Sequence, residues 1–291
     1  MLLAQEVNSH PSIMSQGLSS VPIMPVVLLV NGFQLSSSFY TSYVLRLCSW
    51  GYAVLQYDLP GHVLMKKLIP DDQEAALLPQ LLRWVSSAQS SHSNKPSVDV
   101  MSNNLYHLPK IDLSSIVLAG HSRGGKLAAL MLAQANQMGI NVKAAALIDP
   151  VDMNFFTRIL GYPSAVDALR GKGAKALLIG AGVTGSCNPP KEGYHKFWEV
   201  LSPLSWQGVI QKAGHMQVTD ASGALGWVLD QMCHVGEGMS HENAMELVNA
   251  QLVAWLELQL RPGPDTEAGI QAFQSWVESK VKEGALTFKI K

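Results

Sequence analysis

A serine between two glycines is the residue in this sequence whose surroundings point most directly to chemistry. Ser122 is the centre of a Gly-x-Ser-x-Gly pattern, with a strand-like apolar run before it and a helix-favouring run after it. A strand that turns sharply into a helix lifts such a hydroxyl above the sheet edge, and Gly120 and Gly124 allow strand and helix to pack closely. The N–H of Arg123 then points to where an oxyanion would form. The pattern predicts a nucleophile rather than a structural turn.

A serine nucleophile needs a base, and the base needs a carboxylate that orients it. Where parallel strands supply them in the order serine, acid, histidine, the base follows the last strand. Of the nine histidines, His215 lies directly after a strand-like run at 207–213. His195 precedes a helix-like run, whereas His234 and His241 lie on or near helices. We therefore expect His215 to be the base, and the structural alternative is a histidine that caps a loop.

The acid is expected at the carboxyl end of a strand between the serine and the base. A common position is the loop after the run at 175–181, but that loop holds neither Asp nor Glu. The preceding strand ends in Ile-Asp-Pro-Val-Asp, which contains Asp149 and Asp152. Asp149, at the strand tip, is the predicted acid, with Asp152 in reserve. The structural alternative for Asp152 is an N-cap before a helix over 153–160.

A second oxyanion donor is expected after the first strand-like run, PVVLLVN, at 25–31. Gly32 lets the backbone turn its amides inward, so the predicted donor is the N–H of Phe33. The apolar loop at 60–70 is interpreted as a lid or a membrane-contacting element, the alternative being a buried connector with solvated lysines. His121 is expected to pack against the nucleophile's turn or to reach the substrate. The remaining substrate-contact candidates, whose aromatic members could equally be core residues, are Gln34, His62, Met65, Tyr194, Phe197 and Trp198.

The elements that must position these residues alternate along the chain. Strands are expected at 25–31, 53–58, 115–120, 142–149, 175–181 and, as the last, 207–213; helices are expected at 39–50, 71–88 with a kink at Pro79, 127–138, 224–232, 241–260 and 265–282. This alternation predicts an α/β fold of the α/β-hydrolase type, a mainly parallel central sheet with helices on both faces. We expect one domain over 1–291, with 1–24 as an N-terminal segment, 91–109 as an excursion loop and 236–291 as helices packed on the same domain.

Composition narrows the classes of partner. The chain is 47% apolar and only 15% charged, with a mean hydropathy of +0.13, which predicts an exposed apolar surface or a large apolar pocket. A net charge of −1 without a basic tract argues against nucleic acid as a partner.

The three cysteines are widely spaced, at Cys48, Cys187 and Cys233, and predict buried or free thiols in a reducing compartment rather than a disulfide scaffold. No apolar run approaches the roughly 20 residues of a membrane span. The N-terminus shows no targeting pattern, so a targeting peptide is expected to be absent or already removed.

Three motifs together resemble chlorophyllase. They are Gly-His-Ser-Arg-Gly-Gly-Lys at the elbow, Asp-Pro-Val at the end of the next strand and Gly-His-Met after the last strand. The likeness continues in Asn-Gly-Phe through Ser-Phe-Tyr at 31–40 and in Cys-Asn-Pro through Phe-Trp at 187–198, and covers about residues 25–235. The arginine after the serine favours this resemblance over lipases and cutinase-like esterases, in which Met or Gln is commoner at that position.

The resemblance implies a carboxylic ester hydrolase that releases phytol and chlorophyllide from chlorophyll, with Ser122, Asp149 and His215 as its triad. The magnesium belongs to the substrate, so neither a cofactor nor a protein metal site is implied. The first strands of the usual fold are barely represented before Pro25, and the helices after Cys233 look longer than in plant members, which indicates an algal or cyanobacterial member of a photosynthetic lineage. The expected location is the chloroplast in a eukaryote, or the cytoplasm and thylakoid periphery in a cyanobacterium. The alternatives are a broad-specificity esterase or lipase on the same fold and a non-catalytic pigment- or lipid-binding module.

Overall fold

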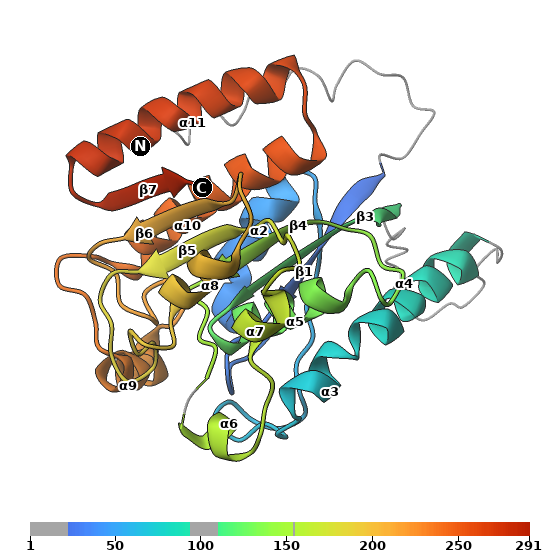
Figure 1. Cartoon of the computed structure of the whole chain (residues 1–291), viewed down its shortest axis with the longest axis horizontal. Helices are drawn as coiled ribbons and strands as arrows, with labels where there is room; N and C mark the ends of the chain where they lie inside the picture. The colour runs from blue at the N-terminus through green and yellow to red at the C-terminus, as the bar shows by residue number, and fades with distance from the viewer. Residues whose placement is uncertain (1–22, 94–109, 154) are drawn as a thin grey trace.

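A seven-stranded sheet organises the computed structural model, which describes residues 23–93, 110–153 and 155–291 (Figure 1). The strand order is β2-β1-β3-β4-β5-β6-β7, in which the first six are parallel and β7 runs antiparallel to β6. The strands are β1 (Met24–Val30), β2 (Ala53–Leu55), β3 (Ile111–His121), β4 (Val142–Ile148), β5 (Leu177–Ala181), β6 (Trp206–Ile210) and β7 (Leu286–Ile290). The expected α/β-hydrolase type of fold is confirmed.

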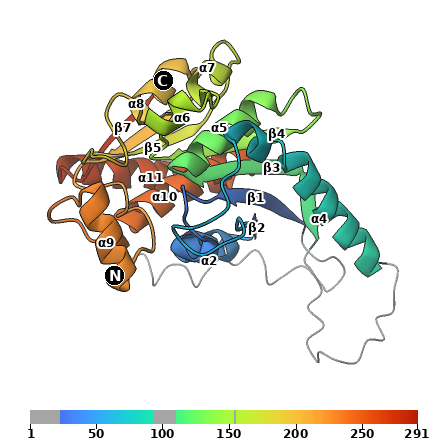
Figure 2. The ribbon, with the colours of Figure 1, turned by 90° about the horizontal axis from the view of Figure 1, so that it is seen from below.

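Helices cover both faces of this sheet, as Figure 2 shows from below. They are η1 (Ser37–Tyr40), α2 (Thr41–Ser49), α3 (Asp71–Ala75), α4 (Leu78–Ser93), α5 (Arg123–Gln134), α6 (Phe155–Ile159), α7 (Ala165–Leu169), α8 (Tyr194–Val200), α9 (Gly223–Cys233), α10 (His241–Leu260) and α11 (Pro264–Lys282). Alternate residues of each strand point to opposite faces. In β1, Val27 and Leu29 join the core beneath α2, α10 and α11, whereas Leu28 joins the core beneath α5, α7 and α8.

The helix expected over 71–88 is two helices, since α3 ends at Ala75 and α4 begins at Leu78. Pro79 therefore lies in the first turn of α4, where a backbone N–H would have no partner within the helix. The first three residues of the loop expected at 91–109 are the end of α4, and its remaining residues lie outside the described part of the chain. Nearly all of the N-terminal segment 1–24 also lies outside it.

The strand at 207–213 is not the last one. β7 follows α11 and pairs with β6 in antiparallel register, with Leu286 opposite Ile210. Leu286 is buried, and Phe288 packs edge-on against Trp206. The strand forms the sheet edge with only five residues and carries a charge at Lys289, and both features are common protections of an exposed edge.

Two of the three cysteines form a disulfide, contrary to expectation. Cys187, in the loop after β5, is bonded to Cys233, at the end of α9, and their Cα atoms are 5.0 Å apart. The parallel sheet brings these two segments to the same edge although 46 positions separate them in sequence. Cys48 is a free thiol and is exposed.

The parallel strands place the segments that follow them at one edge of the sheet, where α/β proteins bind their ligands. Ser122 follows β3, Asp149 follows β4 and the loop with His215 follows β6. The loop from Asn31 follows β1 and borders the same edge. None of the helices in the described ranges is long and apolar enough to cross a membrane.

Candidate active site

The turn at Ser122 has the geometry of a nucleophile elbow. Ser122 has φ +58° and ψ −124°, a conformation that costs energy in a residue with a Cβ and clusters at active sites. Its own N–H donates to Ile148 O at 3.0 Å, which anchors the turn to β4. A Cβ at Gly124 would lie 2.1 Å from Val30 O, and one at Gly120 would lie 2.3 Å from Gly124 O. Both flanking positions therefore require glycine.

The structure brings Ser122, His215 and Asp149 into one hydrogen-bonded series. His215 Nε2 lies 2.9 Å from Ser122 Oγ, and His215 Nδ1 lies 2.6 Å from Asp149 Oδ2. A carboxylate can only accept, so Nδ1 carries the ring proton and Nε2 is free to accept the serine proton. His215 is 3% exposed and Asp149 is fully buried, whereas Ser122 is 9% exposed. This arrangement can activate the serine hydroxyl as a nucleophile.

Three donors hold the Asp149 carboxylate. Besides His215, the N–H of Ala181 donates to Oδ1 at 3.0 Å, and Asn188 Nδ2 donates to Oδ2 at 2.9 Å. Asn188 is buried and also donates to Val183 O, so its amide orientation is determined. Asn188 was not predicted from the sequence. The only sequence feature that pointed to it was the Cys-Asn-Pro segment of the family resemblance, in a loop that contains neither Asp nor Glu.

Asp152 has a different role from Asp149. Its carboxylate accepts from Ser164 Oγ at 2.6 Å and from the N–H of Ala165 at 2.6 Å. Ala165 is the first residue of α7, so Asp152 caps that helix. The N-cap alternative therefore gave the right kind of contact but the wrong helix, because α7 and not the segment 153–160 receives it.

The loop after β1 forms a tight turn beside Ser122. Leu35 N–H donates to Gly32 O at 3.1 Å, and Gln34 adopts φ +61°. Gly32 N–H donates to Tyr40 Oη at 2.8 Å, and a Cβ at Gly32 would lie 2.9 Å from the same oxygen. Among the described residues, the N–H groups of Phe33 and Arg123 donate to no other protein group. Both are therefore free to bind an oxyanion.

A buried pair links this turn to the base. Tyr40 Oη lies 3.0 Å from His121 Nδ1, and His121 Nε2 lies 3.1 Å from the carbonyl oxygen of His215. Because the carbonyl only accepts, Nε2 donates and Nδ1 accepts the tyrosine proton. Burial and the nearby His215 charge lower the pKa of His121 well below its usual value, so it is neutral. His121 packs against the nucleophile's turn and is no substrate contact; Tyr40 was missed.

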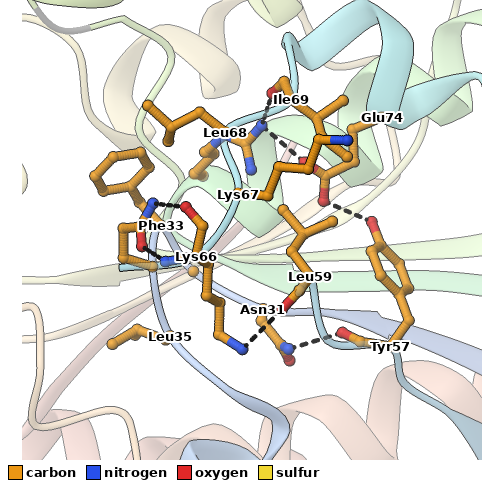
Figure 3. A pocket seen from close by; sticks show the side chains of 13 residues that line it. Asn31, Phe33, Leu35, Tyr57, Leu59, Lys66, Lys67, Leu68, Ile69 and Glu74 are labelled. Carbon is orange, nitrogen blue, oxygen red and sulfur yellow. Dashed lines mark hydrogen bonds and ion pairs between the residues drawn. The ribbon is translucent and has the colours of Figure 1, made fainter. Parts of the chain in front are cut away.

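A pocket opens between the loop after β1 and the segment after β2 (Figure 3). Gln34 lines it, and Met65 lies nearby with 73% of its surface exposed. His62 is exposed on the same segment. Lys66 is buried with Nζ 3.3 Å from Asp58 Oδ1, so the alternative of a buried connector with both lysines solvated is wrong. Of its apolar side chains, Leu64, Met65 and Leu68 are exposed, whereas Val63 and Ile69 are half-buried.

The aromatic candidates on α8 lie away from this pocket. Phe197 is fully buried in the core shared with α5 and α7. Trp198 packs against that core beneath the ammonium group of Lys289. Tyr194 is buried near Asp149, and burial together with that carboxylate raises its pKa to about 12. These side chains support the sheet, so the expectation that Phe197 and Trp198 contact substrate is wrong.

Comparisons with known proteins identify the family of this chain and agree with its fold. The chlorophyllase family model matches residues 13–274. The chain is 26% identical to chlorophyllase-2 of Arabidopsis thaliana over 89% of this chain and 81% of the relative, and 28% identical to chlorophyllase-1 of the same plant over 81% and 72%. It is 25% identical to chlorophyllase type 0 of Chenopodium album over 67% and 56%.

Among solved structures, a ferulic acid esterase from Streptomyces cinnamoneus superposes with a TM-score of 0.54 at 21% identity, over 84% of this chain and 70% of that one. At this identity the likeness concerns the fold. With a family match over most of its length, the chain belongs to the chlorophyllase family and is a carboxylic ester hydrolase.

Proposed function

We propose that this protein hydrolyses the ester that joins phytol to the chlorophyll macrocycle, with Ser122 as the nucleophile. The observation that carries the proposal is the hydrogen-bonded series from Ser122 Oγ through His215 to Asp149, with distances of 2.9 and 2.6 Å. Membership of the chlorophyllase family supports the choice of ester.

The proposed mechanism has two acyl-transfer steps. His215 takes the proton of Ser122 as its Oγ attacks the propionate carbonyl carbon, and Asp149 stabilises the resulting imidazolium. The N–H groups of Phe33 and Arg123 bind the oxyanion. His215 then protonates the phytol oxygen as the carbon–oxygen bond breaks. In the second step, His215 takes a proton from water as the water oxygen attacks the acyl carbon. His215 then returns this proton to Ser122 Oγ as the bond between Oγ and the acyl carbon breaks and chlorophyllide leaves.

Exposed apolar side chains beside the pocket suit a substrate of this kind. Phe33, Leu64, Met65 and Leu68 are between 43% and 73% exposed. Covering such surface with a phytyl chain or a macrocycle is favourable by about 25 cal/mol per Å². The apolar border therefore favours a large apolar ester over a small polar one.

We extend the proposal to a peripheral contact with the thylakoid surface, in a chloroplast or a cyanobacterial cell. The helix α9 follows the His215 loop and exposes Trp227 and Met232, with 64% and 58% of their surfaces free. Together with Met65 and Leu68, these side chains would enter the outer part of a lipid layer that holds the substrate.

The test is hydrolysis of purified chlorophyll a in dilute detergent, with p-nitrophenyl butyrate as the parallel substrate. The wild type should form chlorophyllide, and Ser122→Ala should lose at least about 10⁴-fold in rate on both esters. Wild-type activity in Ser122→Ala would contradict the nucleophile. Cleavage of the butyrate ester alone would indicate a general esterase, and cleavage of neither ester a binding module.

A further inference from the structure

The segment from Leu59 to Pro70, here called the strap, is attached to the protein at two points that matter for the oxyanion. It lies between β2 and α3 and forms one wall of the pocket (Figure 3). Leu64, Met65 and Leu68 expose their side chains, but the backbone of the strap is bound to Gln34 and to Arg123.

The first attachment is a pair of side-chain hydrogen bonds. Gln34 Oε1 accepts from the N–H of Lys66 at 2.5 Å, and Gln34 Nε2 donates to Lys66 O at 3.1 Å. The N–H of Leu64 also donates to Gln34 O at 3.1 Å. Gln34 directly follows Phe33 and has φ +61°, a conformation that a residue with a side chain rarely adopts. The strap therefore stabilises the turn that presents the Phe33 N–H.

The second attachment uses the guanidinium of Arg123. Its Nη2 donates to Ile69 O at 2.8 Å, and its Nε donates to Asp71 Oδ1 at 2.8 Å. Nη2 also lies 2.8 Å from Glu74 Oε2. Lys126 Nζ pairs with Asp71 Oδ2 at 2.7 Å, so the half-buried Arg123 and the buried Lys126 balance two buried carboxylates. The end of the strap is thus fixed to the residue whose N–H is the other oxyanion donor.

We infer that the strap sets the separation of the two oxyanion donors, and that Gln34 and the Arg123 side chain are positioning residues for the transition state. This inference rests on the proposed function. The two N–H groups come from segments about 90 residues apart in sequence, and the strap is bonded directly beside both. Donors aimed at the oxyanion accelerate the reaction only when they are held where the charge develops.

The decisive variant is Gln34→Met, which keeps the length of the side chain and removes both hydrogen bonds. On p-nitrophenyl butyrate, whose acyl chain is too short to cover the strap, kcat should fall about tenfold while KM stays within twofold. The affinity for a butyl trifluoromethyl ketone, which forms a tetrahedral adduct with the serine, should fall by the same factor. Gln271→Met, on the exposed surface of α11, is the matched control and should behave as the wild type.

Arg123→Lys is the second variant, because it keeps a cation beside Asp71 and Glu74 but loses the fork that reaches Ile69 O. It should lower kcat and ketone affinity together, as Gln34→Met does. It replaces Gln34→Met as the decisive variant if the melting temperature of Gln34→Met is too low for the assay. A rise in KM with unchanged kcat, or unchanged ketone affinity in a folded variant, would overturn the inference and leave the strap as a pocket wall.

Fluorophosphonate labelling distinguishes failure of the proposed function from failure of the inference about the strap. A wild type that is not labelled at Ser122 refutes the proposed function, whereas a labelled wild type with unaffected variants refutes only the role of the strap.

Discussion

The two sides of the Ser122 site are built in opposite ways. On the acid–base side, Asp149, Asn188 and His215 are at most 3% exposed, and each polar group is paired. On the oxyanion and pocket side, Phe33 and Met65 are 51% and 73% exposed. In the proposed mechanism, this difference means that the groups for proton transfer are already ordered before substrate binds, whereas the substrate side leaves apolar surface for a ligand to cover.

Cross-links strengthen the acid–base side further. Gln217 Oε1 accepts from the N–H groups of Gly214 and Gly236, at 2.7 and 2.6 Å, and so joins the His215 loop to the segment after α9. The Cys187–Cys233 disulfide joins the end of α9 to the loop that carries Asn188. Backbone and side-chain bonds therefore connect the segments that hold the acid and the base.

The largest effect is expected from the acid. Asp149→Asn keeps the shape of the side chain but no longer fixes the proton on His215 Nδ1, so kcat on p-nitrophenyl butyrate should fall by about 10⁴-fold. Asp152→Asn should lower the melting temperature through the α7 cap and keep most of the activity. If Asp149→Asn were active and Asp152→Asn were folded but inactive, Asp152 and not Asp149 would be the acid of the site.

The next effect concerns the disulfide. Replacing both Cys187 and Cys233 by Ser should lower the free energy of unfolding by about 2–5 kcal/mol, measured by urea titration, because the cross-link restricts the unfolded chain. Cys48→Ser is the control and should be neutral. If the double variant is as stable as the wild type, the cross-link does not stabilise the acid–base side as the comparison requires.

A smaller effect, confined to the pigment, is expected on the pocket side. Met65→Ser combined with Leu68→Ser removes two exposed apolar side chains that touch no part of the triad, so stability and p-nitrophenyl butyrate turnover should not change. KM for chlorophyll should rise roughly thirtyfold, since each of the two lost contacts is worth about 1 kcal/mol. Leu45→Ser, equally exposed on α2, is the control. Equal losses on both esters would place these side chains in the catalytic machinery instead.

The smallest effect is a change in how stability depends on pH. Because the pKa of His121 lies well below its usual value in the folded protein, the unfolded chain takes up a proton near pH 6.5 that the folded chain does not. Stability from this group is therefore full above pH 6.5 and is lost as the pH falls below it, by at most about 1.4 kcal/mol per pH unit. His121→Gln removes this term. The stability advantage of the wild type should shrink between pH 7 and 5, and parallel curves would contradict a neutral His121.

Much of this architecture follows from patterns that are local in sequence. The apolar runs before Ser122 and Asp149 predict parallel strands because buried strands carry apolar residues on both faces. Chain order then places the serine, the acid and the histidine at one sheet edge. β7 escaped prediction because its five alternating residues follow two long helices and offer no crossover pattern.

What escaped prediction at the site depends on tertiary contacts. The approach of Cys187 to Cys233, and of Asn188 to Asp149, joins segments with no local signal for each other. Phe197 and Trp198 were assigned to the pocket by residue type, but aromatic side chains serve a core equally well.

Nucleophilic attack by Ser122 is tested most directly by trapping the acyl-enzyme. Wild-type protein mixed with chlorophyll a and quenched with acid during the first turnover is digested and mapped by mass spectrometry. We expect the chlorophyllide acyl group, without the magnesium that the acid removes, on the peptide that contains Ser122, and no such group in Ser122→Ala. Chlorophyllide formed without that adduct, or at an undiminished rate by Ser122→Ala, would contradict nucleophilic attack by this serine.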